Sequence, residues 1–479
     1  MSSLESGTLY YGDCLDWMSE WDDQCVDLIY LDPPFNSKTD YNVLYSTEGE
    51  TAQFRAFVDT WEWDDKAALR FDRYEGGAGK LAHDAVIGLE RILGPSGMLA
   101  YLTYMAERLE QMHRLLKPTG SIYLHCDPTA SHYLKVVMDA IFGAQNFKNE
   151  IVWSYQRYTA KSNKFQREHD VILFYGGNRA EFNTVYRPYS EQSGKRDSHY
   201  KQDEAGRWFR WQKRRGQEPY KVYLSERGRR MGDVWPLPHI NASAKERLGY
   251  PTQKPLALVE RLIKASSNPG DLVLDPFCGC GTTIDAARRL NRGWAGIDIS
   301  SFAVDLIVER RLQGASVATK GIPTDLASAR KLAREQPFNF ESWAVTRLPG
   351  FAPNTKKVGD GGVDGRGVLT VKPDDFDSRL ALAQIKGGKF GISPFRDFVG
   401  VTKRDKAAIG CYVTLDSEGT PASKIEMLQA GRIKVGGVPY PRVQLWPISH
   451  YFDGRRPNLP PMNDPYSGKP MQPTLGLFA

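Results

Sequence analysis

The chain contains 479 residues, of which 41% are apolar and 11% aromatic. This length predicts about two to four domains, each with a sizeable core. No run of about 18 apolar residues occurs, so we expect no membrane-spanning helix and no membrane partner. The N-terminus lacks the charged and apolar parts of a signal peptide, and the six cysteines form no CxxC pair. Both features are typical of a cytoplasmic protein with reduced thiols.

The net charge of +6 is concentrated in one segment. Residues 185–247 carry 15 Lys and Arg against 8 Asp and Glu, a net charge of +7, so the rest of the chain carries −1. Aromatic residues alternate with this charge in RWFRWQKRRG, residues 207–216. The combination indicates contact with a nucleic-acid backbone, and a solvated basic loop is the alternative. The residues expected to bind DNA are Arg207, Arg210, Lys213, Arg214 and Arg215.

Residues 1–177 alternate apolar stretches with amphipathic stretches, which predicts a parallel sheet covered by helices. The expected strands are 26–32, 120–126 and 171–176, and the expected helices are 82–93, 102–116 and 131–142. The alternation stops at 178–250, which is polar, basic and aromatic. We interpret this segment as an inserted recognition region.

The alternation returns over residues 251–313. The expected helices there are 255–266, 282–291 and 301–312, and the expected strands are 271–275 and 294–299. Residues 314–336 are small and polar and predict a linker. Residues 337–450 predict a second compact domain, and the proline-rich segment 451–479 predicts an extended or disordered tail.

Two of the predicted strands end on a carboxylate. The strand in DLIYLDPPF ends at Asp32, and the strand in DLVLDPFCGCGTT ends at Asp275, before a turn that contains Gly279 and Gly281. Glycine lets the backbone approach a ligand closely, but the spacing is not GxGxxG and no P-loop lysine follows, so phosphate is not the expected ligand. Asp298 ends the next strand, where an acid can accept both hydroxyls of a ribose. Because ligands of open α/β sheets bind at the carboxyl ends of strands, Asp32 faces this ligand if the two strands are neighbours.

These motifs resemble those of the amino-group DNA methyltransferases that use S-adenosylmethionine. DPPF (32–35) and DPFCGCG (275–281) are similar to the family's catalytic and cofactor motifs, in the order of the permuted β group. Further matches are GDCLDWM, LHCDPTASHYLKVVMDAIFG, NEIVW and YPTQKPLALVERLI. The resemblance covers residues 1–312 and implies a Rossmann-like α/β methyltransferase with an inserted target-recognition region.

The resemblance gives Asp-Pro-Pro-Phe a chemical role. An exocyclic amine of a base is a poor nucleophile because its lone pair is delocalised into the ring, and two acceptors can draw it toward a tetrahedral form. The Asp32 carboxylate and the Pro33 carbonyl would be these acceptors, on a backbone held by Pro33 and Pro34. Phe35 would stack on a base flipped out of double-stranded DNA. The amine then attacks the methyl group directly, without a covalent enzyme intermediate.

The resemblance also implies a cofactor pocket. Asp13 would contact the adenosine amino group, and Asp298 would contact the ribose. The other residues expected to bind the cofactor are Lys254, Pro255, Asp275, Phe277, Gly279, Gly281 and Thr282. Cys278 and Cys280 could suggest a metal site, but we interpret them as small residues of the pocket wall.

The base that would be methylated follows from one position. Family members that act on cytosine N4 more often have Ser where Asp32 stands, so the sequence favours adenine N6 and keeps cytosine N4 as the alternative.

Residues 36–74 are rich in aromatic and charged side chains. We interpret them as a mobile loop that closes over the flipped base, and a surface excursion is the alternative.

The C-terminal part contains a second set of polar groups. The turn GDGGVDG presents Asp364, and the strand LALAQIK presents Gln384 and Lys386 on one face. A carboxylate and an amide oxygen beside a lysine can assemble a Mg²⁺ site with a water nucleophile, and Glu341 can orient the metal or the water. With FES and GVTKRDKAAIGCYVT, these residues resemble the Mrr-type nucleases of the PD-(D/E)xK class. The acidic excursion KPDDFD (372–377) departs from that pattern, and an inactive DNA-binding remnant is the alternative.

The features together predict a site-specific DNA adenine methyltransferase fused to a small α/β domain with Mg²⁺-dependent endonuclease activity, in restriction–modification or phage defence. One alternative is a cytosine-N4 methyltransferase whose C-terminal domain only binds DNA. An alternative of another class is a non-enzymatic DNA-binding regulator. The expected partner is double-stranded DNA with one flipped base, and the sequence leaves the recognition site and a homodimer open.

Overall fold

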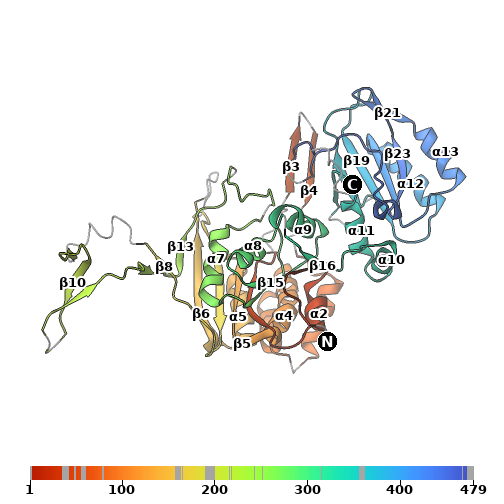
Figure 1. Cartoon of the computed structure of the whole chain (residues 1–479). Helices are drawn as coiled ribbons and strands as arrows, with labels where there is room; N and C mark the ends of the chain where they lie inside the picture. Colours follow the sequence, from red (N-terminus) through yellow and green to blue (C-terminus); the bar gives the residue numbers. More distant parts are fainter. Residues whose placement is uncertain are drawn as a thin grey trace.

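The chain forms a large α/β body, a smaller α/β domain beside it and an arm that projects from the large body, as Figure 1 shows. The computed structural model describes residues 3–34, 42–47, 50–55, 61–77, 80–156, 163, 165–188, 200–214, 216, 218–241, 243–250, 252–313, 315–354, 362–465 and 468–471. No helix in these ranges is long and apolar enough to cross a membrane.

A nine-stranded sheet forms the centre of the large body, in the order β13-β6-β7-β5-β2-β14-β15-β1-β16. The strands are β1 (Thr8–Tyr11), β2 (Val26–Leu31), β5 (Leu116–Cys126), β6 (Phe147–Ser154), β7 (His169–Gly176), β13 (Val234–Pro236), β14 (Leu272–Asp275), β15 (Gly293–Asp298) and β16 (Ala318–Lys320). The expected parallel sheet is confirmed from β5 to β16. The prediction of parallel strands is wrong at β7, which is antiparallel to β5 and β6. β7 follows β6 in the sequence and lies beside it in the sheet, and consecutive neighbouring strands can pair antiparallel without a crossover.

Helices cover both faces of this sheet. The sequence of β2 is almost continuously apolar because both of its faces are buried. Leu28 and Tyr30 belong to the buried cluster on one face, and Ile29 and Leu31 belong to the cluster on the other face. The first face carries α7 (Leu256–Ser266), α8 (Thr282–Arg289) and α9 (Ser301–Leu306), and the second carries α1 (Cys14–Glu20), α2 (Asp65–Glu75), α3 (His83–Leu93), α4 (Gly97–Leu115) and α5 (Ser131–Phe142). The predicted helices are therefore confirmed, with the last one shorter and followed by the π-helical turn Ile307–Arg311.

The segment expected to be a mobile loop, 36–74, contains regular structure. Strands β3 (Asn42–Thr47) and β4 (Glu50–Arg55) form an antiparallel hairpin, and α2 packs on α4. The side chains at 35–60 lie outside the described residues, and so does the expected stacking of Phe35.

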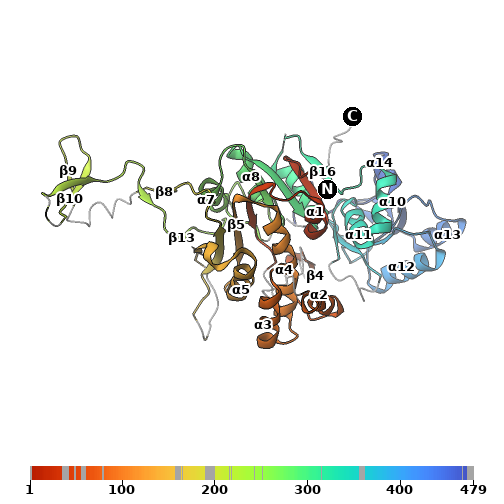
Figure 2. The ribbon, with the colours of Figure 1, turned by 90° about the horizontal axis from the view of Figure 1, so that it is seen from below.

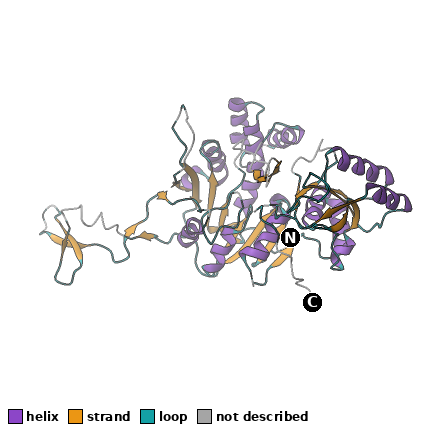
Figure 3. Cartoon of the chain, turned by 90° about the horizontal axis from the view of Figure 1, so that it is seen from above, coloured by secondary structure: helices purple, strands orange, loops and turns teal. Residues whose placement is uncertain are grey.

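The expected insertion at 178–250 forms the arm. Its base is a ribbon of β8 (Tyr186–Arg187) and β12 (Arg229–Arg230), and its tip is a sheet of β9 (Lys201–Gln202), β10 (Trp208–Gln212) and β11 (Tyr220–Tyr223). The described residues of the arm are strands, turns and loops, and Figure 3 shows how far they extend from the helical body. At its end the arm returns to the large body, where β13 pairs with β6.

Residues 314–336, predicted as a linker, are largely folded. β16 pairs with β1 at the edge of the large sheet. Helix α10 (Leu326–Glu335) begins at Asp325, whose side chain and that of Ser328 form a capping box. A segment that is small and polar in sequence thus carries one strand and one helix.

The C-terminal domain contains a five-stranded sheet in the order β17-β18-β19-β20-β23. Its elements are α11 (Pro337–Thr346), β17 (Phe351–Pro353), β18 (Gly365–Val368), β19 (Leu380–Lys386), α12 (Ile392–Arg404), β20 (Ile409–Thr414), α13 (Pro421–Ala430), β21 (Arg432–Val435), β22 (Val438–Pro441), β23 (Val443–Pro447) and α14 (Ser449–Phe452). The acidic excursion at 372–377 does not disturb this sheet, since β18 and β19 pair directly. The Asp374 carboxylate instead accepts hydrogen bonds from the amides of Gly436 and Gly437 in the β21–β22 turn.

The two domains share a packed interface between α9 and α11. The Tyr11 hydroxyl donates to the Asn339 carbonyl over 2.7 Å, and Arg347 pairs with Asp305. The predicted tail also takes part, because Met462 is buried and Asp464 forms a 2.7 Å ion pair with Arg310 of the large body. Part of the tail is therefore ordered, and residues 472–479 lie outside the described range.

Candidate functional site

The two strands that end on carboxylates are neighbours. β2 and β14 run parallel, with Leu28 opposite Val273 and Ile29 opposite Leu274. Asp32 follows the end of β2, and Asp275 is the last residue of β14. The expected meeting of the Asp-Pro-Pro turn and the glycine turn at one edge of the sheet is confirmed.

The two carboxylate oxygens of Asp32 differ in their contacts within the part of the chain that the structure describes. Its Oδ2 accepts from the ammonium of Lys254, and the two side chains are only 15% and 10% exposed. Its Oδ1 is buried and has no hydrogen-bond partner among the described residues. A buried carboxylate oxygen without a donor is costly, so this atom is suited to receive an N–H group from a bound molecule.

Lys254 lies in the turn that precedes α7. Its ammonium points to Asp32 and its carbonyl accepts from the Thr282 hydroxyl over 3.3 Å, at the start of α8. The sequence predicts Lys254 and Pro255 in a cofactor motif, and in the structure Lys254 contacts both Asp32 and Thr282, which follows the glycine turn. Pro255 is the N-cap of α7.

The glycine turn is braced by Asp298. The amide of Gly279 donates to Asp298 Oδ2 over 2.7 Å, and the amide of Ser300 donates to Oδ1 over 2.8 Å. Gly281 has a φ of 75°, and a Cβ there would lie 2.7 Å from Ile307, so only glycine fits. Burial raises the pKa of Asp298 to about 6, because the ionised carboxylate is poorly solvated.

Asp275 lies behind the turn. It accepts from the amide of Phe277 over 3.1 Å, and burial, followed by the charges of Asp32 and Asp298, raises its pKa to about 7. Three carboxylates at adjoining strand ends form an electronegative site with Lys254 as its cation. Such a site suits a ligand that carries positive charge.

Asp13, the residue expected to bind the adenosine amine, is already engaged. Its Oδ1 accepts from the amide of Leu15, and both of its oxygens lie within 2.7 Å of the Arg108 guanidinium. Arg108 comes from α4 and is buried. Sequence motifs contained no signal for this partner, which lies 95 residues away.

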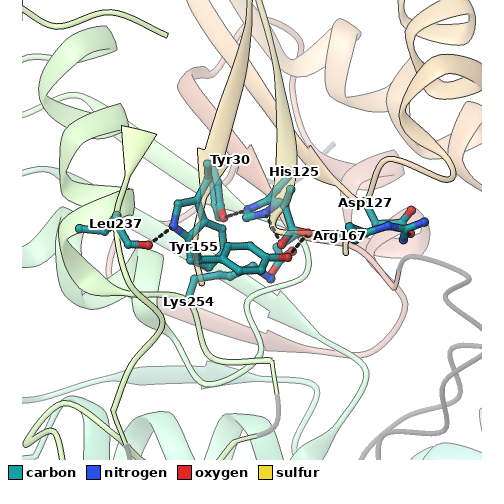
Figure 4. A network of polar contacts seen from close by, with 10 residues as sticks. Tyr30, His125, Asp127, Tyr155, Arg167, Leu237 and Lys254 are labelled. Carbon is teal, nitrogen blue, oxygen red and sulfur yellow. Dashed lines mark hydrogen bonds and ion pairs between the residues drawn. The ribbon is translucent and has the colours of Figure 1, made fainter. Parts of the chain in front are cut away.

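A polar network next to Asp32 was not predicted at all (Figure 4). The Tyr30 hydroxyl lies 2.9 Å from His125 Nδ1, whose Nε2 lies 3.4 Å from Asp170. Tyr155 donates to the other Asp170 oxygen over 2.9 Å. Burial acts to raise the pKa of Asp170, but these hydrogen bonds and the charge of Lys254 outweigh it and lower the pKa to about 2. The available signal was a histidine within the apolar strand SIYLHC, since a buried histidine needs polar partners.

The second predicted site lies in the C-terminal domain. Asp364 precedes β18 and accepts from the amide of Ile385 over 2.7 Å, which places it beside the end of β19. Gln384 on β19 is buried, and its Oε1 has no partner among the described residues. Lys386 ends the same strand, and Glu341 lies on α11. In the ranges that the structure describes, no group of three or more His, Cys, Asp or Glu residues could hold a metal ion.

The predicted DNA-binding cations lie on the arm. Arg207 is paired with Asp203 over 2.9 Å and stacks on Tyr223. Arg210 and Lys213 are exposed, and Arg214 lies over Tyr220 with 5.8 Å between its guanidinium and the ring centroid. Arg215 lies outside the described residues.

A mainly parallel sheet with Asp-Pro-Pro after one strand, a glycine turn after its neighbour and an acid after the third is the arrangement of a DNA methylase. Residues 26–309 match the family model described as DNA methylase, and the chain belongs to this N6/N4 DNA methylase family.

Individual relatives are similar over parts of the chain. Type II methyltransferase M.HpaI of Haemophilus parainfluenzae is 33% identical over 213 residues, which cover 44% of this chain and 59% of that protein. DNA adenine methyltransferase YhdJ of Escherichia coli is 25% identical over 315 residues, with 65% of this chain and 84% of YhdJ covered. The solved M1.HpyAVI–SAM complex matches 62% of this chain and 96% of its own, at 18% identity and a TM-score of 0.34. The chain thus spans less than two thirds of M.HpaI.

Proposed function

We propose that the protein transfers a methyl group from S-adenosylmethionine to the exocyclic amine of a base in double-stranded DNA. The observation that carries this proposal is the buried Oδ1 of Asp32, which has no hydrogen-bond partner among the described residues, at the strand edge where the glycine turn and Asp298 also lie. Asp298 and the glycine turn would hold the nucleoside part of the cofactor. The electronegative surroundings of Asp32 and Asp275 suit its sulfonium charge.

S-adenosylmethionine supplies an electrophilic methyl group when it is bound. Asp32 Oδ1 accepts one N–H of the target amine, and the Pro33 carbonyl accepts the other. Both bonds would draw the nitrogen lone pair out of conjugation, so that nitrogen could bond to the methyl carbon while the carbon–sulfur bond breaks and a neutral thioether leaves. The surplus proton on nitrogen would pass to Asp32 Oδ1. Lys254 holds Oδ2 and therefore keeps the carboxylate in one orientation during this step. The base must leave the duplex to reach Asp32, because the amine is otherwise paired.

We infer that adenine N6 is the target. The support is an aspartate, rather than a serine, at position 32, together with the similarity to a relative named as a DNA adenine methyltransferase. Cytosine N4 is the second candidate because the matching family is defined for both amines.

The test is nucleoside analysis of DNA incubated with the protein and isotopically labelled S-adenosylmethionine. We expect labelled N6-methyladenine from the wild type and none from Asp32→Ala, which should still bind cofactor and DNA. Labelled N4-methylcytosine would overturn the base assignment. Wild-type protein that binds no S-adenosylmethionine would instead support a non-enzymatic DNA-binding regulator.

A Mg²⁺-dependent endonuclease activity is a second candidate function, favoured by the buried Oε1 of Gln384, which has no partner among the described residues, and by Asp364, whose carboxylate accepts from the amide of the adjacent Ile385. These two oxygens fit a hard divalent cation, and Lys386 can stabilise charge on the scissile phosphate. A metal held there would make its bound water more acidic and polarise the phosphate. The methyltransferase on the same chain would shield the cell's own DNA.

The nuclease is tested with the full chain, since the two domains share a packed interface. Methylated and unmethylated plasmid are incubated with Mg²⁺ or Mn²⁺. We expect cleavage of unmethylated DNA that is lost in Asp364→Ala and Lys386→Ala and kept in Asp377→Ala, an exposed acid of the same domain. No cleavage of either plasmid would leave the domain as a DNA-binding module.

A further inference from the structure

The sheet at the tip of the arm has two faces of different character. It stands away from the large body in two views (Figure 1, Figure 2). Large aromatic side chains remain exposed there, with Trp208 38%, Trp211 53% and Tyr223 41% exposed. Since a strand directs alternate residues to opposite sides, the sequence WFRWQ of β10 divides into two rows.

The first row, Phe209 and Trp211, contacts other side chains of the arm. Phe209 pairs with Tyr223 and Trp211 with Lys221 across the strands, so these four side chains share one face. The Lys221 ammonium lies 4.5 Å from the Phe209 ring centroid and 5.7 Å from that of Trp211. Phe209 is 5% exposed although the sheet is a surface element. This face holds the ribbon together by aromatic and cation–π contacts.

The second row is Trp208, Arg210 and Gln212, which lie on the opposite side of β10. Within the described part of the chain, the side chains of Arg210 and Gln212 make no hydrogen bond or ion pair, and both are exposed. A guanidinium and a carboxamide held two residues apart on a rigid strand can each form a bidentate pair of hydrogen bonds. Their place opposite the packed row means that the arm need not unfold to present them.

Double-stranded DNA fits this surface better than a protein partner does. Residues 200–235 carry 10 Lys and Arg against 5 Asp and Glu. Strand β9 pairs with β10 only at Trp208 and Phe209, so the part of the tip that carries Arg210 and Gln212 is a two-stranded ribbon of β10 and β11. A two-stranded ribbon fits the major groove, where Arg pairs with guanine and Gln with adenine. Residues two apart on a strand are separated by about 6.8 Å, close to the rise of about two base-pair steps.

We propose that the row of Trp208, Arg210 and Gln212 reads base edges in the major groove, with Arg210 on a guanine and Gln212 on an adenine two base pairs away. The inference rests on the proposed methyltransferase function and names the residues that set its sequence specificity. Arg210 is then distinguished from Lys213, which follows the strand and contacts phosphate. The first row supports the second without touching bases.

The test is sequencing of methylated positions in DNA from cells that express the full chain. In Arg210→Ala and in Arg210→Lys we expect discrimination at one guanine position of the motif to fall about tenfold or more, because neither variant offers a bidentate fork. Gln212→Ala should relax one adenine position instead. The matched control Lys213→Gln should lower methylation of all sites alike and leave the motif unchanged.

Two results would overturn the inference: an unaltered motif in all three β10 variants, or a uniform loss in Arg210→Lys that matches the Lys213→Gln control. Arg210→Lys keeps the charge and guards against a loss caused by misfolding. Failure of the proposed function itself is recognised separately, because the wild type would then leave no methylated site.

Discussion

The clearest test of the cofactor site is the replacement of Asp298 by Asn. Its carboxylate accepts hydrogen bonds of 2.7 and 2.8 Å from the amides of Gly279 and Ser300, and in the proposed function it would also accept the ribose hydroxyls. A charge-assisted hydrogen bond contributes about 1.5–3 kcal/mol, so we expect affinity for S-adenosylmethionine to fall about tenfold or more.

The pH dependence gives the prediction a sign. Burial raises the pKa of Asp298 to about 6, so the carboxyl becomes protonated as the pH falls through this value and loses its strength as an acceptor. If only the ionised form binds well, the dissociation constant should rise about tenfold between pH 7 and pH 5. Asp298→Asn should lack this step. Asp275 titrates at a higher pH than Asp298, because burial raises its pKa to about 7.

Calorimetric titration of the full chain with S-adenosylmethionine at pH 5, 6, 7 and 8 measures both effects. Asp305→Asn is the matched control, because burial also raises the pKa of Asp305 to about 6 but its partner is Arg347 in the other domain. The control should keep the wild-type pH profile. The reasoning is refuted if Asp298→Asn binds with wild-type affinity, or if its profile still contains the step near pH 6.

Three further predictions address other contacts. Lys254→Met should lower kcat in a methylation assay with little change in KM for DNA, because Asp32 loses the group that orients it; an unchanged kcat would contradict this role. Asp305→Ala should lower the free energy of unfolding by about 3–5 kcal/mol in denaturant titration, since it leaves Arg347 buried without its charge partner, and a loss within experimental error would exclude a stabilising interface pair. Lys213→Gln should reduce the slope of log affinity against log salt by about one, measured by DNA titration over a range of salt concentrations, and an unaltered slope would place Lys213 in solvent.

The local sequence was sufficient to predict most strands and helices of the large body and the residues at the ends of its strands. A nearly continuous apolar run predicted β2 and β14 because buried strands face a core on both sides. The turn glycines and the acids at 32, 275 and 298 stood directly at strand ends, so their common edge followed from a parallel sheet. No strand was predicted at WFRWQ, so the two rows of β10 are a finding of the structure.

Tertiary structure decided the partners. Lys254 contacts Asp32, 222 residues away in the sequence, and Arg108 contacts Asp13, 95 residues away. At such separations the sequence pattern does not predict which residues are in contact. The same holds for β16, a short polar segment that becomes a strand because β1 offers an unpaired edge. Periodicity reports which face of an element is buried, and it does so locally. Which polar groups meet at that face depends on how distant elements pack, since a buried charge is stable only where the fold brings a partner to it.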